Sequence, residues 1–303
     1  MTSFLDRLAD GHVLLTDGAT GTNFQDMGLP PGVGPEEWVF DAPDRVTELH
    51  RRFAEAGSEF FLTCSFGASS VRLADGPLAG RAKELNVRAA ELAREVVGAD
   101  GIVGGTMGPT GQLVEPYGPL TRELCQAAYA EQAQALAEGG VDVLVLETFF
   151  ALEEALWAVD GIGNMTDLPL IISFSFDQGT RTMMGISPAD VVAAFEPLGV
   201  AAIGANCGRS LEDSDTVVGE FLQATNLPVW VKPNAGVPQV VGDTVLYPAD
   251  PETLAVHIAD YARRGARIVG GCCGTTPEHI SAIARRLPRK TSATQRRGPA
   301  PGV

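Results

Sequence analysis

Eight short apolar runs rich in β-branched residues recur along the chain, and this repetition constrains the fold more than any other feature. Most are followed by turn residues and then by an alanine-rich stretch with helical periodicity. The apolar runs cover residues 13–16, 59–63, 102–106, 141–146, 168–174, 202–205, 228–231 and 267–270. The helical stretches include residues 45–56, 81–97, 122–138, 151–159, 188–198 and 251–264. A strand–helix unit repeated eight times predicts an α/β fold, a single (β/α)8 TIM barrel.

The alternative arrangement is an open, doubly wound sheet, but eight units of this length more often close into a ring. No GxGxxG or Walker-type loop supports a nucleotide-binding fold. We expect the barrel to occupy residues 1–287. Residues 288–303 are basic and contain Gly and Pro, which predicts a disordered C-terminal tail.

The charge balance limits the classes of partner. The chain has 22 Lys and Arg residues against 38 Asp and Glu residues, a formal net charge of −16. Because phosphate backbones and anionic lipids attract basic surfaces, this balance argues against nucleic acid and against a membrane surface. No stretch approaches the 18 uninterrupted apolar residues of a membrane span, and the first ten residues do not form a signal peptide. We therefore expect a cytoplasmic protein.

Three of the five cysteines follow predicted strands. Cys207 follows the sixth apolar run, and Cys272 and Cys273 follow the eighth. A barrel of this kind builds its active site at the carboxyl ends of its strands, and three thiolate ligands with one open position are typical of catalytic zinc. Glycines on both sides of the pair allow its side chains to face one ion. Ordinary buried thiols are the alternative for the three, and packing is the expected role of Cys64 and Cys125.

Glu147 is a candidate substrate contact because it directly follows the apolar run at 143–146. A buried carboxylate needs a partner, which a substrate ammonium or the strand-end cation Lys232 can supply. The histidines offer no competing centre. His12, His50 and His257 are expected on the surface or in packing, and His279 is expected at an exposed helix start.

Three motifs in order resemble the zinc-dependent homocysteine S-methyltransferase family across residues 15–287. They are DGATGT at 17–22, NCG at 206–208 and GGCCGTTPEH at 270–279, at the ends of the first, sixth and eighth strands. The resemblance is closest to the homocysteine-binding module of cobalamin-dependent methionine synthase. It implies an enzyme that methylates homocysteine to methionine. It also implies one Zn²⁺ held by Cys207, Cys272 and Cys273, and substrate contacts from Asp17, Gly18, Ala19, Glu147, Asn206 and Asn234.

The identity of the methyl donor is less constrained. Family members that use a methylated corrinoid typically carry the PNAG turn found here at 233–236, whose Asn234 can occupy the fourth zinc position. The betaine-using branch tends to place Tyr where this chain has Thr148. We therefore expect a methylated corrinoid on a separate protein that docks at the barrel mouth. S-methylmethionine and betaine stay open as donors, as does a thiol other than homocysteine as acceptor. A corrinoid-system binding partner without homocysteine turnover is the alternative from another class.

Overall fold

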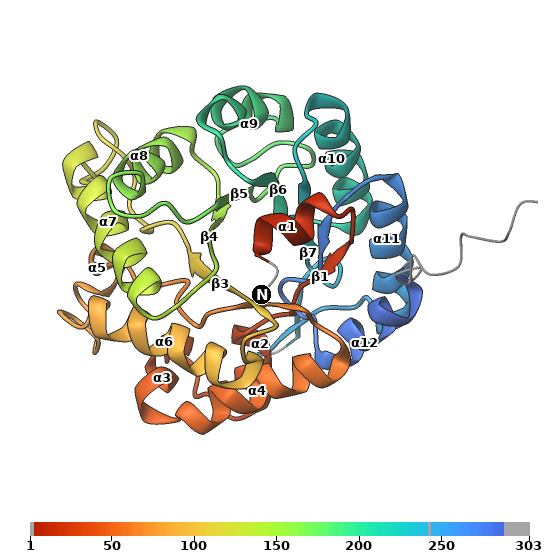
Figure 1. The fold of residues 1–303 in the computed structure, drawn as a ribbon, viewed down its shortest axis with the longest axis horizontal. Helices are drawn as coiled ribbons and strands as arrows, with labels where there is room; N and C mark the ends of the chain where they lie inside the picture. Colours follow the sequence, from red (N-terminus) through yellow and green to blue (C-terminus); the bar gives the residue numbers. More distant parts are fainter. Residues whose placement is uncertain (1–2, 242–243, 288–303) are drawn as a thin grey trace, which may run out of the picture.

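A computed structural model describes residues 3–241 and 244–287, and its central feature is a ring of eight parallel strands (Figure 1). Around the ring the order is β1–β10–β7–β6–β5–β4–β3–β2. A parallel bridge between Thr16 and Phe60 joins the two end strands and closes the ring. The strands are β1 (Leu14–Leu15), β2 (Phe60–Leu62), β3 (Ile102–Met107), β4 (Val143–Phe149), β5 (Leu170–Phe174), β6 (Ala202–Cys207), β7 (Val229–Pro233) and β10 (Ile268–Val269). The predicted barrel is confirmed, and an open sheet is excluded. The predicted tail at 288–303 lies outside the described residues.

Long helices follow the strands and surround the ring. They are α4 (Pro43–Ala56), α6 (Ala82–Val97), α7 (Arg122–Glu138), α8 (Leu152–Ile162), α9 (Pro188–Phe195), α10 (Leu211–Ala224), α11 (Pro251–Arg264) and α12 (Pro277–Arg286). Shorter elements are α2 (Gly21–Asp26), α3 (Trp38–Asp41), α5 (Ser70–Leu73), η1 (Pro35–Glu37) and η2 (Glu196–Leu198). The helix α10 is an addition to the predicted set. Ser210 caps its N-terminus, since the Ser210 hydroxyl accepts a hydrogen bond from the backbone N–H of Asp213 at 3.1 Å.

An additional N-terminal helix, α1 (Phe4–Ala9), lies across the end of the barrel that faces the reader in Figure 1. Its Phe4 ring contacts Phe60 at 5.8 Å between centroids, and Phe60 in turn contacts Trp230 at 5.5 Å, both edge to face. These residues belong to the apolar cluster inside the ring. The helix therefore closes the amino-terminal end of the barrel and leaves the carboxyl ends of the strands for chemistry.

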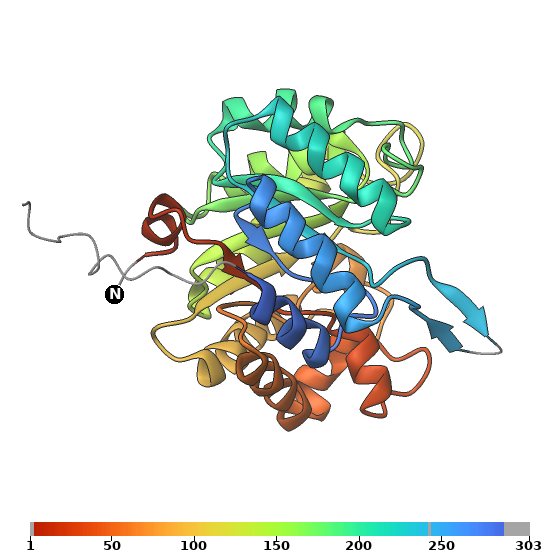
Figure 2. The same ribbon diagram turned by 90° about the vertical axis from the view of Figure 1, so that its right-hand side faces the viewer.

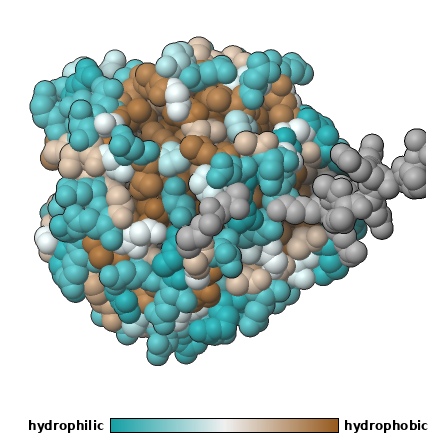
Figure 3. All heavy atoms as spheres, in the orientation of Figure 1, coloured by the Kyte–Doolittle hydropathy of each residue, from teal (hydrophilic) through white to brown (hydrophobic). Residues whose placement is uncertain are grey.

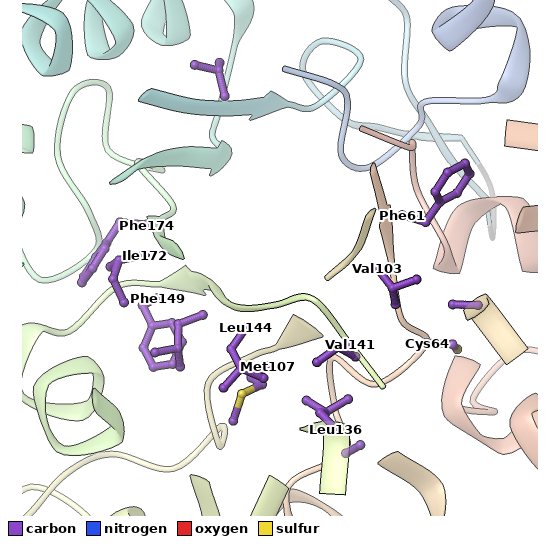
Figure 4. Close-up of a cluster of buried hydrophobic side chains, with 14 of the residues drawn as sticks. Phe61, Cys64, Val103, Met107, Leu136, Val141, Leu144, Phe149, Ile172 and Phe174 are labelled. Atoms are coloured by element: carbon purple, nitrogen blue, oxygen red, sulfur yellow. The ribbon is translucent and has the colours of Figure 1, made fainter. Parts of the chain in front are cut away.

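A second and larger apolar core lies between the ring and the helices (Figure 4). It includes Val103 and Leu144 from the strands and Leu136 from α7. Cys64 is part of this core, and Cys125 is fully buried within α7. The packing role predicted for these two cysteines is confirmed. They take no part in the site described below.

A β-hairpin that the sequence did not predict interrupts the connection between β7 and α11. It consists of β8 (Gln239–Val241) and β9 (Thr244–Leu246). Figure 2 shows it extending away from the barrel on the side opposite α1. The hairpin therefore projects from the end of the barrel where the strands finish.

The surface is mixed in polarity. On the face seen in Figure 3, apolar residues gather in the upper half, and hydrophilic residues cover most of the lower half. Among the helices in the described residues, none combines the length and hydropathy required to cross a bilayer.

Candidate metal and substrate site

Three cysteine side chains, here called the cysteine cluster, meet at the carboxyl ends of β6 and β10. Cys207 is the last residue of β6, and Cys272 and Cys273 lie in the loop between β10 and α12. The three Sγ atoms lie within 4.8 Å of one another, and those of Cys207 and Cys272 are 3.1 Å apart. Three thiolates bound tetrahedrally to one Zn²⁺ at about 2.3 Å lie about 3.8 Å from one another. The donor set and its spacing therefore fit one zinc ion that takes a further ligand.

The backbone is turned sharply to bring these thiols together. Cys207 has a φ of 57°, which non-glycine residues rarely adopt and which is typical of functional sites. In the other loop, a Cβ on Gly271 would lie 2.3 Å from the Thr275 side chain, so only glycine fits there. The Thr275 hydroxyl donates to the carbonyl oxygen of Cys272 at 2.6 Å. This bond holds the loop in the turn that presents both of its thiols.

Hydrogen bonds among the thiols shift the pKa values of Cys272 and Cys273 in opposite directions. Bonds with Cys207 and then Cys272 lower the pKa of Cys273 to about 3. The bond with Cys207 acts to lower the pKa of Cys272, but the bond with Cys273 and burial outweigh it and raise that pKa to about 12. Burial and mutual repulsion therefore oppose the ionisation of all three thiols together, and a bound cation would favour it.

Asn206 is buried near the carboxyl end of β6, where it contacts the cysteine cluster. Its Oδ1 accepts hydrogen bonds from the backbone N–H of Thr148 at 2.9 Å and from the Ser173 hydroxyl at 2.6 Å. Its Nδ2 donates to the Thr148 hydroxyl at 2.7 Å and to Sγ of Cys207 at 3.5 Å. The amide is thus fixed by neighbouring strands and directs an N–H toward a thiol.

Asn234 joins the two loops that carry the cysteines. Its Nδ2 donates to the carbonyl oxygen of Gly208 at 2.9 Å, and its Oδ1 accepts from the backbone N–H of Cys273 at 3.1 Å. The neighbouring Ala235 N–H donates to the carbonyl oxygen of Cys273 at 2.9 Å. The turn after β7 therefore lies between the loops after β6 and β10 and holds them in register.

Asp17 is buried at the end of β1 and has two partners. Its Oδ1 accepts from Nζ of Lys232 at 2.8 Å, and its Oδ2 accepts from the backbone N–H of Leu62 at 2.8 Å. Burial acts to lower the pKa of Lys232, but the carboxylates of Asp17 and Glu147 raise it above its ordinary value. Lys232 pairs with Asp17 rather than with Glu147.

Gly18 and Ala19 follow Asp17 and pack against the loop that carries the cysteine pair. A Cβ on Gly18 would lie 2.8 Å from the carbonyl oxygen of Thr275 and 2.9 Å from the Phe53 ring. The Ala19 N–H donates to the Thr275 carbonyl and hydroxyl oxygens, each at 3.1 Å. The segment after β1 is therefore joined directly to the loop after β10.

Glu147 lies near the carboxyl end of β4, and the residue is 7% exposed. Its Oε1 accepts from the Thr106 hydroxyl at 2.5 Å. Burial raises the pKa of Glu147 to about 7, although the positive charge of Lys232 acts to lower it. A buried carboxyl group with so raised a pKa and a single neutral donor is suited to receive a cationic ligand.

Two residues of the site were not identified from the sequence. His279 is buried, so the prediction of an exposed helix-start residue is wrong: its Nδ1 accepts from the Thr276 N–H at 3.2 Å, and its Nε2 contacts the Ala249 carbonyl oxygen at 3.0 Å. Tyr247, which follows β9, packs against Gly274 next to the cysteine pair. The motif that ends in His279 was a usable signal for the first, but nothing in the sequence pattern indicates the position of Tyr247.

A sequence model of the family described as homocysteine S-methyltransferase matches residues 14–287, which include every residue of this site. The chain belongs to the homocysteine S-methyltransferase family. It is 33% identical to methionine synthase of Mycobacterium leprae over 98% of its own length, and 32% identical to that of Mycobacterium tuberculosis over 93%. It spans about a quarter of the length of these relatives, 26% and 25%.

Solved structures of the homocysteine methyltransferase MmuM from Escherichia coli are also similar. The oxidised form superposes with a TM-score of 0.80 and the metallated form with 0.79. Each is 26% identical to this chain, and the match covers 93% of this chain and 99% of the other. A homocysteine methyltransferase therefore shares the whole barrel.

Proposed function

We propose that this protein is a zinc-dependent methyltransferase that binds homocysteine as a thiolate and converts it to methionine. The observation that carries the proposal is the cysteine cluster: Cys207, Cys272 and Cys273 bring three thiols within 4.8 Å at the active-site end of the barrel. They would hold one Zn²⁺ per chain. A family neighbour in a metallated form supports this assignment.

The chemistry requires a nucleophile that a free thiol does not supply. With an ordinary pKa near 8.5, only about 3% of a thiol is ionised at pH 7. Zinc supplies deprotonation of the bound thiol at neutral pH. The electron pair of the substrate sulfur then forms the new S–C bond, and the pair of the broken donor–methyl bond leaves with the donor. The protein has to align these groups and keep water away.

Glu147 is our candidate for the substrate ammonium. Its carboxyl group is buried, has one hydroxyl donor and has a pKa raised to about 7. A cation beside it restores the ionised form and repays the cost of burial. We assign Asp17, Gly18 and Ala19 to the wall that faces the amino-acid end of the substrate, since this segment packs directly on the loop of the cysteine pair.

Asn206 and Asn234 are the remaining proposed substrate contacts, and both lie beside the cysteines that would bind the substrate sulfur. Asn206 directs its Nδ2 toward Cys207 and Cys272, at 3.5 and 3.9 Å from their Sγ atoms. Asn234 connects the two cysteine loops. We propose that Asn206 stabilises the charge on the bound thiolates and that Asn234 adjusts its position when homocysteine enters.

For the methyl donor we propose a methylated corrinoid, presented by a corrinoid protein that docks at the barrel mouth. The methionine synthase relatives, 33% and 32% identical over nearly the whole chain, support this donor. S-methylmethionine is the second candidate, supported by the full-length match to a homocysteine methyltransferase whose chain is about as long as this one. Betaine is less favoured because Thr148 occupies the position after Glu147 and a quaternary ammonium group prefers an aromatic cage.

The deciding experiment is methionine formation from homocysteine by zinc-loaded, reduced protein, with methylcobalamin, S-methylmethionine and betaine offered separately. We expect turnover with methylcobalamin and its loss in Cys207→Ser, whereas Cys125→Ser keeps both zinc and activity. Stoichiometric zinc and full activity in Cys207→Ser would refute the proposed centre. Zinc binding without a homocysteine-dependent change in a cobalt-substituted spectrum, and with no turnover of any donor, would favour a binding partner of a corrinoid system.

A further inference from the structure

The strand β4 contains one residue more than its neighbour β5 where it reaches the site. The two strands pair in register up to Leu146 and Ile172. The next pair is Phe149 with Phe174, so three steps along β4 lie opposite two steps along β5, which is a β-bulge. Thr148 lies in this bulge with a φ of 66°, a left-handed conformation that β-branched residues rarely adopt. Strained backbone of this kind clusters at functional sites.

The bulge determines which side chains of β4 reach the mouth of the barrel. Residues 143–146 alternate, with odd-numbered side chains in the cluster inside the ring and even-numbered ones in the core outside it. Strict alternation would place Thr148 in the outer core and Phe149 inside the ring. Phe149 packs in the outer core instead, and the Thr148 hydroxyl is hydrogen-bonded to Asn206 beside the cysteine cluster. The extra residue therefore brings Thr148 to the site next to Glu147.

Thr148 holds both ends of the Asn206 side-chain amide, which is buried. Its backbone N–H donates to Oδ1 of Asn206 at 2.9 Å, and its hydroxyl accepts from Nδ2 at 2.7 Å. The Ser173 hydroxyl also donates to Oδ1, at 2.6 Å. A backbone N–H can only donate, so the amide atom that it contacts must be the oxygen. Thr148 therefore determines which end of the amide faces away from it.

This orientation matters because the amide lies beside two cysteine sulfurs. Nδ2 of Asn206 is 3.5 Å from Sγ of Cys207 and 3.9 Å from Sγ of Cys272. An N–H group at this place stabilises negative charge on sulfur, whereas a flipped amide would place a carbonyl oxygen against it. The sulfurs therefore face a donor only in the orientation that Thr148 permits.

From these contacts we propose that Thr148 is a positioning residue for the metal centre, which orients Asn206 so that an amide N–H faces the thiolates of Cys207 and Cys272. The inference rests on the proposed zinc site. Three thiolates and one Zn²⁺ carry an excess of negative charge, which a nearby N–H donor stabilises. Groups that orient and support metal ligands in this way typically change metal affinity by about 10–100-fold.

The test compares zinc affinity, measured by chelator competition, and the sulfur-to-metal charge-transfer band of the Co²⁺-substituted protein. Thr148→Val keeps the shape and the backbone N–H but removes the hydroxyl that accepts from Nδ2 of Asn206. We expect it to weaken zinc binding about tenfold and to shift the band to longer wavelength, because the amide N–H is held less firmly against the thiolates. Thr148→Ser keeps the hydroxyl and should restore near-native affinity and spectrum.

Two further variants separate positioning from a general loss of stability. Thr148→Gly adopts the left-handed backbone without strain but lacks the hydroxyl, so it should fold and still bind zinc weakly. Thr166→Val is the matched control, because the Thr166 hydroxyl also accepts a hydrogen bond, from the Leu168 N–H at 3.2 Å, but in the connection between α8 and β5. It should leave affinity and spectrum unchanged. Urea denaturation of zinc-free, reduced protein shows whether each variant is folded.

The dependence on Asn206 is tested by combining two changes. Asn206→Ala removes the amide that Thr148 orients. Adding Thr148→Val to Asn206→Ala should therefore cause little further loss of zinc affinity, although each single change causes a loss. Fully additive losses would show that Thr148 does not act through Asn206 and would overturn its positioning role.

The outcomes also separate this inference from the proposed function. If the wild-type protein binds no zinc, the proposed centre is wrong and the inference falls with it. If the wild type binds one zinc, and folded Thr148→Val and Thr148→Gly both match it in affinity and cobalt spectrum, the role of Thr148 alone is overturned.

Discussion

Lys232 and Asp17 form an ion pair at 2.8 Å across the mouth of the barrel, and their side chains are 2% and 3% exposed. Lys232 lies in β7 and Asp17 follows β1, so the pair spans the strand β10 that separates them. The second Asp17 oxygen accepts the Leu62 N–H, which extends the connection to β2. A single buried carboxylate thus couples three parts of the ring next to the cysteine cluster.

Removing one partner of this pair should be more damaging than removing both. We expect Lys232→Met to lower the free energy of unfolding by roughly 3–5 kcal/mol, because Asp17 is left as an unpaired buried charge. The double variant Asp17→Asn/Lys232→Met should recover a substantial part of that loss. Urea denaturation at pH 7.5 measures both. Equal losses in the single and double variants would show that the charge itself is not the cause.

Glu147 should make homocysteine binding depend on pH. With its pKa raised to about 7, the carboxyl group is largely protonated at pH 6 and largely ionised at pH 8 in the free protein. We therefore expect the KM for homocysteine to rise as the pH falls from 8 to 6. In Glu147→Gln the KM should be at least tenfold higher at pH 8, and this dependence should flatten. Steady-state kinetics across that range test it, and an unchanged KM in the variant would remove Glu147 from the ammonium site.

The same carboxyl group should reduce stability at high pH. Its folded pKa of about 7 lies above an unfolded value near 4.3, so the folded state binds the proton more tightly. The stabilisation is complete below about pH 4.3 and is lost as the pH rises through 7, by roughly 4 kcal/mol in all. Glu147→Gln should therefore gain stability relative to the wild type between pH 5 and pH 8. Denaturation curves of the metal-free, reduced wild type and Glu147→Gln at pH 5 and pH 8 measure this change. A variant that loses stability relative to the wild type from pH 5 to pH 8 would contradict the prediction.

The sequence was sufficient to predict the barrel and the convergence of the cysteines. The repeated strand pattern determines the number of strands, and parallel strands bring Cys207, Cys272 and Cys273 to one end of the ring. The sequence was not sufficient for the partners of individual charges. Lys232 was considered as a partner for Glu147, but it pairs with Asp17, and this choice depends on side-chain geometry between strands that are distant in sequence.

Elements with weak periodicity were also missed. The helix α1 is six residues long, and the hairpin strands β8 and β9 have three each, so none offers a full pattern to read. His279 looked like an ordinary first-turn residue because its partner Ala249 is 30 positions away. The parts that sequence did not predict are therefore the long-range contacts that complete the site, including the position of Tyr247.

Asn206 provides a sharp test of the electrostatics around the proposed metal. Its Nδ2 lies 3.5 Å from Sγ of Cys207 and donates to the Thr148 hydroxyl at 2.7 Å. Asn206→Asp keeps the shape but places a carboxylate beside the thiolates, so we expect zinc affinity to fall at least tenfold. Asn164→Asp is the control, because Asn164 is exposed at the end of α8. Chelator competition at pH 8 measures both, and equal affinity in the two variants would contradict the proposed role.

His50 should make the folded state sensitive to acid. It is buried in α4 beside Phe61, and neither ring nitrogen has a hydrogen-bond partner. Burial lowers the pKa of His50, although the charge of Asp17 acts to raise it. The unfolded chain therefore takes up a proton near pH 6.5 that the folded chain does not, so stability falls as the pH drops below that value, by up to about 1.4 kcal/mol per pH unit. His50→Leu should be less sensitive to acid than the wild type between pH 7 and pH 5. Urea midpoints at both pH values test this, and parallel pH dependence in the two proteins would place the acid sensitivity elsewhere.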